Sequence, residues 1–133
     1  MARPRRTEQL GLAEAPLDDA LIVDLVRVQA ARGGLPDAHD TLRLADLFAT
    51  LGDPTRLRIV AALQAQELCV GDLAAALGLS DSATSHQLRV LRQQGLARSR
   101  KEGRLVYYTL DDEHVSSLYR EGLDHVLHLG DDV

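Results

Sequence analysis

Hydrophobic residues recur at helical spacing in three stretches along the first half of the chain, and glycine or proline residues separate these stretches. The pattern predicts three helices, at residues 17–34, 40–53 and 54–64. Asp18 or Asp19 is placed to cap the first of them. Residues 1–16 contain two prolines and few apolar side chains, so we expect a mobile N-terminal arm there. A single domain is then expected over residues 17–133.

A more specific pattern follows these helices. The stretch "VGDLAAAL" predicts a short helix ended by Gly78, and Ser80 can cap the next helix, "DSATSHQLRVLRQQ", which Gly95 closes. Two helices joined by a glycine-containing turn of about three residues form a helix-turn-helix. Two β-prone runs then flank Glu102–Gly103, which predicts a hairpin with a two-residue turn. The expected fold is mainly α with one β-hairpin, a winged helix-turn-helix.

The net charge of −5, taken alone, argues against a nucleic-acid partner, but the charges are unevenly distributed along the chain. Residues 81–110 contain six basic and two acidic residues, whereas residues 111–133 contain one basic and seven acidic residues. One surface therefore suits a polyanion and another suits cations. We find no signal peptide and no apolar run of about 18 residues, so we expect no membrane contact and a cytoplasmic location.

The second helix of a helix-turn-helix lies in the DNA major groove, with its N-terminal residues at the base edges. Short hydroxyl, imidazole and amide groups in this part of the chain can bond to bases or phosphates, and nearby basic side chains attract phosphates without reading sequence. We therefore predict contacts with double-stranded operator DNA from Ser82, Thr84, Ser85, His86, Gln87, Arg89, Arg100, Lys101 and Arg104.

Three of the five histidines lie in the last predicted helix, which Asp111 or Asp112 can cap and which runs to about Leu129. At about 100° per residue, His114 and His125 share one face but lie about 16 Å apart along the axis. Because a zinc–nitrogen bond is about 2.0–2.1 Å, both cannot bind one ion within one chain. Two antiparallel copies bring Asp112 and His114 of one helix against His125 and His128 of the other.

The residues between these two ends form an apolar seam at helical spacing, composed of Val115, Leu118, Gly122, Val126 and Leu129. We therefore predict a homodimer joined through its terminal helices, with two symmetry-related metal sites. Three nitrogens and one oxygen suit tetrahedral Zn²⁺, and Co²⁺ can substitute for it.

Two other functions remain open. The protein can be a DNA-binding winged-helix dimer whose histidines have a structural or pH-related role and whose inducer is not a metal. It can also be a hydrolytic metalloenzyme. A catalytic zinc usually keeps one position open for water, however, and four protein ligands fill the tetrahedron. We therefore predict that the protein is not an enzyme.

Five motifs together resemble the ArsR/SmtB family of bacterial metal-sensing repressors: "LGDPTRLRIV", "ELCVGDLA", "SHQLRVLRQQGL", "GRLVYY" and "LDDEHV…LDHVLH". The resemblance covers roughly residues 42–129. It implies a metal-free dimer that binds a palindromic operator and releases it when zinc binds, which derepresses metal efflux or storage genes. It also implies that the His125 ring N–H points to a backbone carbonyl near Gly95.

The chain departs from the family pattern in its thiols. Arsenic- and lead-type members often carry Cys-x-Cys in the segment that begins "ELC", but the second position here is Gly71, and Cys69 is the only cysteine. Some members use a second site, whose first half Cys69 and Asp72 match. The arm lacks its remaining ligands, because no Cys or His precedes His39. Zinc is favoured, and a cobalt- or nickel-responsive member is the alternative.

Overall fold

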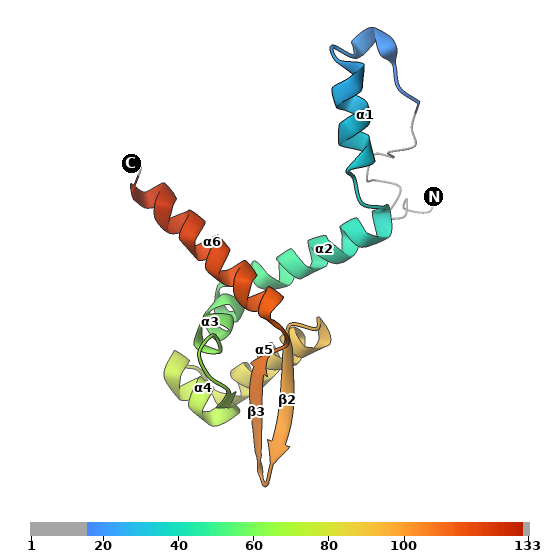
Figure 1. Ribbon diagram of the computed structural model, residues 1–133. Coiled ribbons are helices and arrows are strands. Elements are labelled where there is room, and N and C mark those ends of the chain that lie inside the picture. Colours follow the sequence, from blue (N-terminus) through green and yellow to red (C-terminus); the bar gives the residue numbers. More distant parts are fainter. Residues whose placement is uncertain (1–15, 132–133) are drawn as a thin grey trace, which may run out of the picture. The chain divides into compact units, whose positions relative to one another are not determined.

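The computed structural model describes residues 16–131, in which helices dominate and three short strands form one sheet (Figure 1). The chain divides into two compact units, Met1–Asp46 and Leu47–Val133. The predicted arm, residues 1–16, lies outside the described residues except for Pro16. The boundary that we placed after residue 16 stays a prediction.

The first unit contains the 3-10 helix η2 (Asp19–Leu21), the helix α1 (Leu25–Gly33) and the start of α2 (Ala38–Leu51). The prediction that one helix begins near Leu17 is wrong. Asp18 instead closes a tight turn, in which its Oδ1 accepts a hydrogen bond from the backbone N–H of Ala20 at 3.1 Å. Asp24 caps α1 by accepting from the N–H of Arg27 at 3.1 Å. The local aspartate–backbone bond thus competes with helix formation at residues 18–20.

The second unit carries the predicted helix-turn-helix. Its elements are the end of α2, α3 (Pro54–Ala62), β1 (Leu68–Cys69), α4 (Val70–Leu77), α5 (Asp81–Gln93), β2 (Ala97–Glu102), β3 (Leu105–Leu110) and α6 (Glu113–Asp131). Gly78 ends α4 with φ +68°, a left-handed conformation that glycine adopts without steric cost. Ser80 caps α5, and its Oγ accepts from the N–H of Ala83 at 3.0 Å. Both boundaries agree with the prediction.

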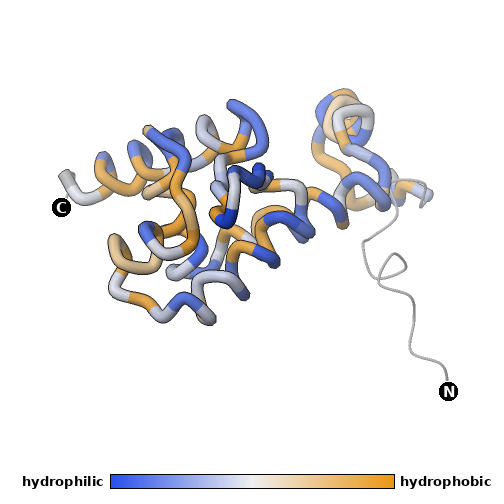
Figure 2. The backbone as a smooth tube through the Cα atoms, turned by 90° about the horizontal axis from the view of Figure 1, so that it is seen from below, coloured by the Kyte–Doolittle hydropathy of each residue, from blue (hydrophilic) through white to orange (hydrophobic). Residues whose placement is uncertain are grey.

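Apolar side chains from α3, α4 and α5 meet in one core within this unit. Figure 2 shows how hydrophobic and hydrophilic residues alternate along the helices. Ile59, Leu73, Leu88 and Leu91 are all fully buried. Val115 of α6 also belongs to this core, with 4% of its surface exposed. Its predicted place in the seam between two copies is therefore wrong, because its own protomer already covers it.

The sheet is antiparallel in the order β1-β3-β2. The hairpin pairs Glu102 with Leu105, so the turn is Gly103–Arg104, one residue later than predicted. Gly103 has φ +60°, and every described residue with a positive φ is a glycine. A glycine with positive φ in the first turn position is typical of a type II′ turn. The strand β1, which directly precedes the predicted helix "VGDLAAAL", was not predicted.

Among residues 16–131, no helix combines the length and the apolar character that a bilayer crossing requires.

Candidate DNA-binding surface and metal-ligand stripe

The exposed face of α5 presents the polar groups that the sequence predicts for contact with DNA. Ser82, His86 and Arg89 are exposed, and Ser85 is half-buried. These side chains are held on the outside because Leu88 and Leu91, on the opposite side of α5, are fully buried. This part of the predicted surface is therefore available to a partner.

Thr84, which the sequence analysis placed among the DNA contacts, does not lie on that surface. It is fully buried, and its hydroxyl donates to the backbone carbonyl of Ser80 at 2.9 Å. It lies four residues before Leu88 and seven before Leu91, which places it on the core face of the helix. Thr84 therefore supports the first turn of α5 and cannot contact DNA.

Gln87 is half-buried on the flank of α5. Its Oε1 accepts a hydrogen bond from Arg56 Nε at 2.9 Å. The Arg56 Nη1 donates in turn to the carbonyl of Thr50 at 3.1 Å. Because a guanidinium only donates, the amide of Gln87 must direct its oxygen toward Arg56. Gln87 thus links α5 to α3, a role that sequence patterns do not indicate.

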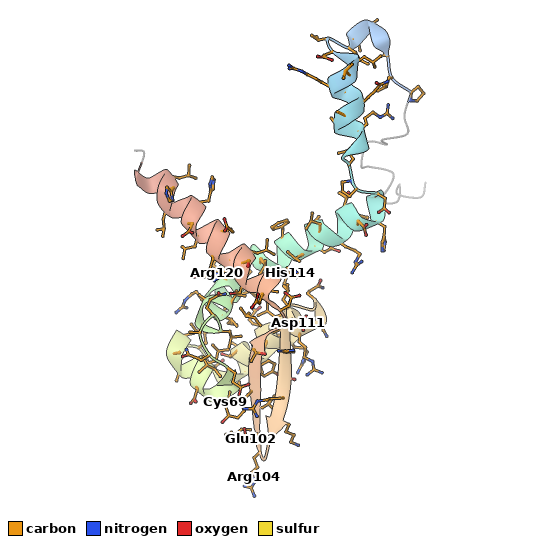
Figure 3. The ribbon with its side chains drawn as sticks, in the orientation of Figure 1. Cys69, Glu102, Arg104, Asp111, His114 and Arg120 are labelled. Carbon is orange, nitrogen blue, oxygen red and sulfur yellow. The ribbon has the colours of Figure 1, made fainter. Side chains whose placement is uncertain are left out.

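The hairpin presents basic residues at its tip, where Lys101 and Arg104 are exposed. Figure 3 shows Arg104 at this end of the hairpin. Arg100 differs from its predicted role as a phosphate contact. Its Nε lies 2.9 Å from both carboxylate oxygens of Glu67, and its Nη1 donates to Glu102 Oε2 at 2.7 Å. Its guanidinium also stacks on Tyr107, 4.8 Å from the ring centroid.

These contacts largely satisfy the charge of Arg100. The hydrogen bonds that Arg100 donates, to Glu67 first and then to Glu102, raise the pKa of Arg100 above its ordinary value. Arg100 in turn lowers the pKa of Glu67. Since both carboxylates are already paired with this guanidinium, Arg100 anchors the hairpin to the segment before β1. Lys101 and Arg104 at the tip stay predicted phosphate contacts.

We predict that the double replacement Lys101→Ala/Arg104→Ala lowers affinity for all DNA sequences alike. The slope of log affinity against log salt should fall by about 0.9 for each phosphate that the protein no longer neutralises. Anisotropy titrations of labelled DNA at several salt concentrations measure this slope. The matched control is Arg120→Ala, which removes an exposed arginine of α6 that hydrogen-bonds to Ser117. An unchanged slope in the double variant contradicts a phosphate-binding hairpin tip.

The start of α6 brings two of the predicted metal ligands together. His114 Nδ1 lies 3.3 Å from Asp112 Oδ2, and both side chains are accessible, with 92% and 49% of their surfaces exposed. Asp112 also caps the helix, because its Oδ1 accepts from the N–H of Val115 at 3.2 Å. This backbone bond, with a smaller contribution from His114, lowers the pKa of Asp112. The lowered pKa favours the ionised carboxylate, which is the form that can bind a metal ion.

The other end of α6 carries His125 and His128, both exposed and one helical turn apart. His128 Nδ1 lies 2.9 Å from the carbonyl oxygen of Asp124. A carbonyl only accepts, so as a hydrogen bond this contact places a hydrogen on Nδ1, and in the neutral ring Nε2 is then the lone-pair nitrogen. Metal-binding histidines commonly have their second nitrogen held in this way.

No cluster of three or more metal-binding side chains exists within one chain over the described range 16–131. The Asp112–His114 pair and the His125–His128 pair lie at opposite ends of α6, as the helical spacing predicts. Each pair offers two donors, and only a second molecule can bring the two pairs together. The structure thus fits a shared site but does not contain one.

Asp112, His114, His125 and His128 form a stripe of predicted metal ligands along α6. An apolar groove with a volume of about 440 Å³ runs beside this stripe within the second unit. Its walls come from the end of α2, from α3 and from the middle of α6, and its lining residues are Phe48, Leu51, Leu57, Leu118, Tyr119, Gly122, Leu123 and Val126. Phe48 is 52% exposed and Val126 is 61% exposed, so the groove opens to solvent in a single protomer. Leu118, Gly122 and Val126 of the predicted seam line it, whereas Val115 and Leu129 do not.

Three further predicted positions lie elsewhere in the second unit. Cys69 is buried at the junction of β1 and α4, and Asp72 is exposed on the first turn of α4. Gly95 follows α5 with φ +71°, and its N–H donates to the carbonyl of Arg92 at 3.1 Å. The expected contact between Gly95 and a His125 ring stays a prediction.

Comparisons with known proteins agree with this architecture. Residues 53–99 match the family model described as "Bacterial regulatory protein, arsR family". The chain is 49% identical over 113 residues to a "Transcriptional repressor SmtB homolog" of Synechocystis, covering 85% of this chain and 86% of that protein. It is 46% identical over 88 residues to a "Cadmium resistance transcriptional regulatory protein CadC homolog" of Staphylococcus aureus, covering 65% and 73% of the two chains.

Among solved structures, the chain resembles a homodimeric winged helix-turn-helix DNA-binding domain from Mycobacterium bovis, a possible ArsR-family regulator. The TM-score is 0.60 at 30% identity, over 71% of this chain and 88% of that one. The exposed recognition helix, the basic hairpin and these matches lead to one conclusion. The chain belongs to the ArsR/SmtB family of winged helix-turn-helix, DNA-binding transcriptional regulators.

Proposed function

We propose that this protein is a zinc-responsive transcriptional repressor. In this proposal, a metal-free homodimer binds a palindromic operator, and zinc at two intersubunit sites releases it. The regulated genes then encode metal efflux or storage, and the protein acts in the cytoplasm, where the operator DNA lies. The family membership, the repressor among the relatives and the homodimeric structural neighbour support it.

One observation carries the proposal. A single helix presents an exposed Asp112–His114 pair at its start and an exposed His125–His128 pair at its end. An apolar groove with Val126 in its wall lies between them. An antiparallel partner helix that covers the groove also completes two identical metal sites. Both features suit an antiparallel pair of α6 helices, so they support one arrangement.

The donor set favours zinc over softer cations. Three imidazole nitrogens and one carboxylate oxygen form a set that tetrahedral zinc accepts, and zinc bound there would join the two terminal helices. A relative is named for cadmium resistance. A thiolate-rich site, which suits soft metals, cannot form from one buried cysteine in this chain. Nickel(II) prefers a square-planar or tetragonal geometry, whereas three imidazoles and one carboxylate suit a tetrahedral ion.

The test is a titration of labelled DNA from the protein's own upstream region, read by fluorescence anisotropy. We expect tight binding in chelator and a loss of about tenfold or more in buffered free zinc, because such couplings typically amount to about 1–3 kcal/mol. Cobalt and nickel titrations in the same buffer test the alternative metals. Tight binding that none of the three metals changes contradicts the proposal and favours a non-metal inducer.

A further inference from the structure

The helix α3 is hydrogen-bonded at its C-terminal end to the first turn of α6. Ser116 Oγ donates to Gln64 Oε1 at 2.6 Å, and both residues are half-buried. Gln64 lies just past the end of α3, and its Nε2 donates to the carbonyl of Val60 at 3.3 Å. These bonds tie the start of α6 to α3, and they serve neither DNA contact nor metal binding directly.

The N-terminal end of α3 is bonded to the recognition helix. Arg56, in the first turn of α3, donates through Nε to Gln87 of α5 at 2.9 Å. It also donates through Nη1 to the carbonyl of Thr50 at 3.1 Å. The nine residues of α3 span about 13 Å at about 1.5 Å per residue. One short helix thus contacts the metal-ligand helix at one end and the DNA-binding helix at the other.

The first turn of α6 cannot stay unchanged if Asp112 and His114 bind a cation. Asp112 Oδ1 caps the helix through Val115 N–H at 3.2 Å, and Asp112 Oδ2 lies 3.3 Å from His114 Nδ1. A cation bound by both side chains replaces the direct Asp112–His114 contact and acts on the carboxylate that caps this turn. Ser116 is the next residue along this turn. Its bond to Gln64 is short, at 2.6 Å, and is sensitive to any shift of the hydroxyl.

We propose that α3 transmits the state of the α6 stripe to α5 within one protomer. The Ser116–Gln64 bond senses the first turn of α6, and the Arg56–Gln87 bond sets the orientation of the recognition helix. Gln64, Ser116 and Arg56 are positioning residues in this proposal. The inference rests on the proposed function, because it concerns how zinc at the stripe lowers affinity for the operator.

The test compares full-length wild type and Ser116→Ala in the anisotropy titration, in chelator and in buffered zinc. We expect DNA affinity in chelator, and zinc affinity measured by chelator competition, to stay within about threefold of wild type. The zinc-dependent loss of DNA affinity should shrink from about tenfold or more to about threefold or less. Ser116→Thr keeps the hydroxyl and should restore the response. Ser117→Ala, which removes the adjacent hydroxyl, is the matched control.

A second measurement does not depend on DNA. Hydrogen–deuterium exchange of the α5 backbone amides should change with zinc in wild type and stay unchanged in Ser116→Ala. Gln64→Met removes the same bond from the other side and should repeat the result, which covers a folding defect of the serine variant. Full zinc release by both variants overturns the inference alone. A wild-type protein without any zinc response overturns the proposed function, and the inference with it.

Discussion

Replacing His125 with glutamine should leave operator binding in chelator unchanged and abolish release by zinc. His125 is exposed near the end of α6, whereas the predicted DNA contacts lie on α5 and the hairpin tip. Removing it therefore takes one donor from the proposed site and leaves the DNA-binding surface intact. Since loss of an outer-shell partner alone weakens metal binding by about 10–100-fold, loss of a ligand should weaken zinc binding by at least about 100-fold.

The measurement for His125→Gln is the anisotropy titration together with a zinc competition assay. His39→Gln is the matched control, because His39 is also exposed but lies on α2 in the other unit. Binding linkage adds a second condition: saturating operator DNA must weaken zinc binding to wild type by the same factor as zinc weakens DNA binding. A His125→Gln protein that zinc still releases at wild-type concentrations excludes this histidine from the switch.

The elements that were predicted correctly are those with local signals. The helix α4 ends where Gly78 adopts a positive φ, and α5 begins where Ser80 caps it. Both signals act within a few residues. The same holds for α3, which Pro54 starts and Asp53 caps. These boundaries do not depend on tertiary packing, so sequence alone is enough to predict them.

The features that sequence analysis missed depend on distant residues. β1 has only two residues and exists because Leu68 and Cys69 pair with Tyr108 and Tyr107. The Gln64–Ser116 hydrogen bond joins residues 52 positions apart. No periodic pattern predicts a strand so short or a contact so remote.

Two errors at the predicted sites have different causes. Thr84 is in phase with Leu88 and Leu91 on α5, so the helical period was sufficient to predict its burial. Val115 also fits the apolar period of α6, but the period does not reveal which neighbour covers it. Only the packing of α6 against α3 shows that Val115 belongs to the core of its own protomer.

Val126→Asp should convert the protein to a monomer and lower operator affinity by about 100-fold or more. Val126 is 61% exposed in the wall of the apolar groove, where a partner helix is proposed to bind. A carboxylate there must be buried without a partner or left in water, and either outcome opposes association. A monomer contacts one half-site only and loses the avidity of two linked half-sites, which amounts to about 10²–10⁴.

Sedimentation velocity and the anisotropy titration measure the two effects of Val126→Asp on the same sample. Ser117→Asp is the matched control. It adds the same charge nine residues earlier, which at about 100° per residue lies on the opposite side of α6, beside Arg120. The control should remain dimeric and bind DNA as wild type does. A dimeric Val126→Asp protein contradicts the proposed interface, and with it the shared metal sites, because those sites need the two α6 helices to lie against each other.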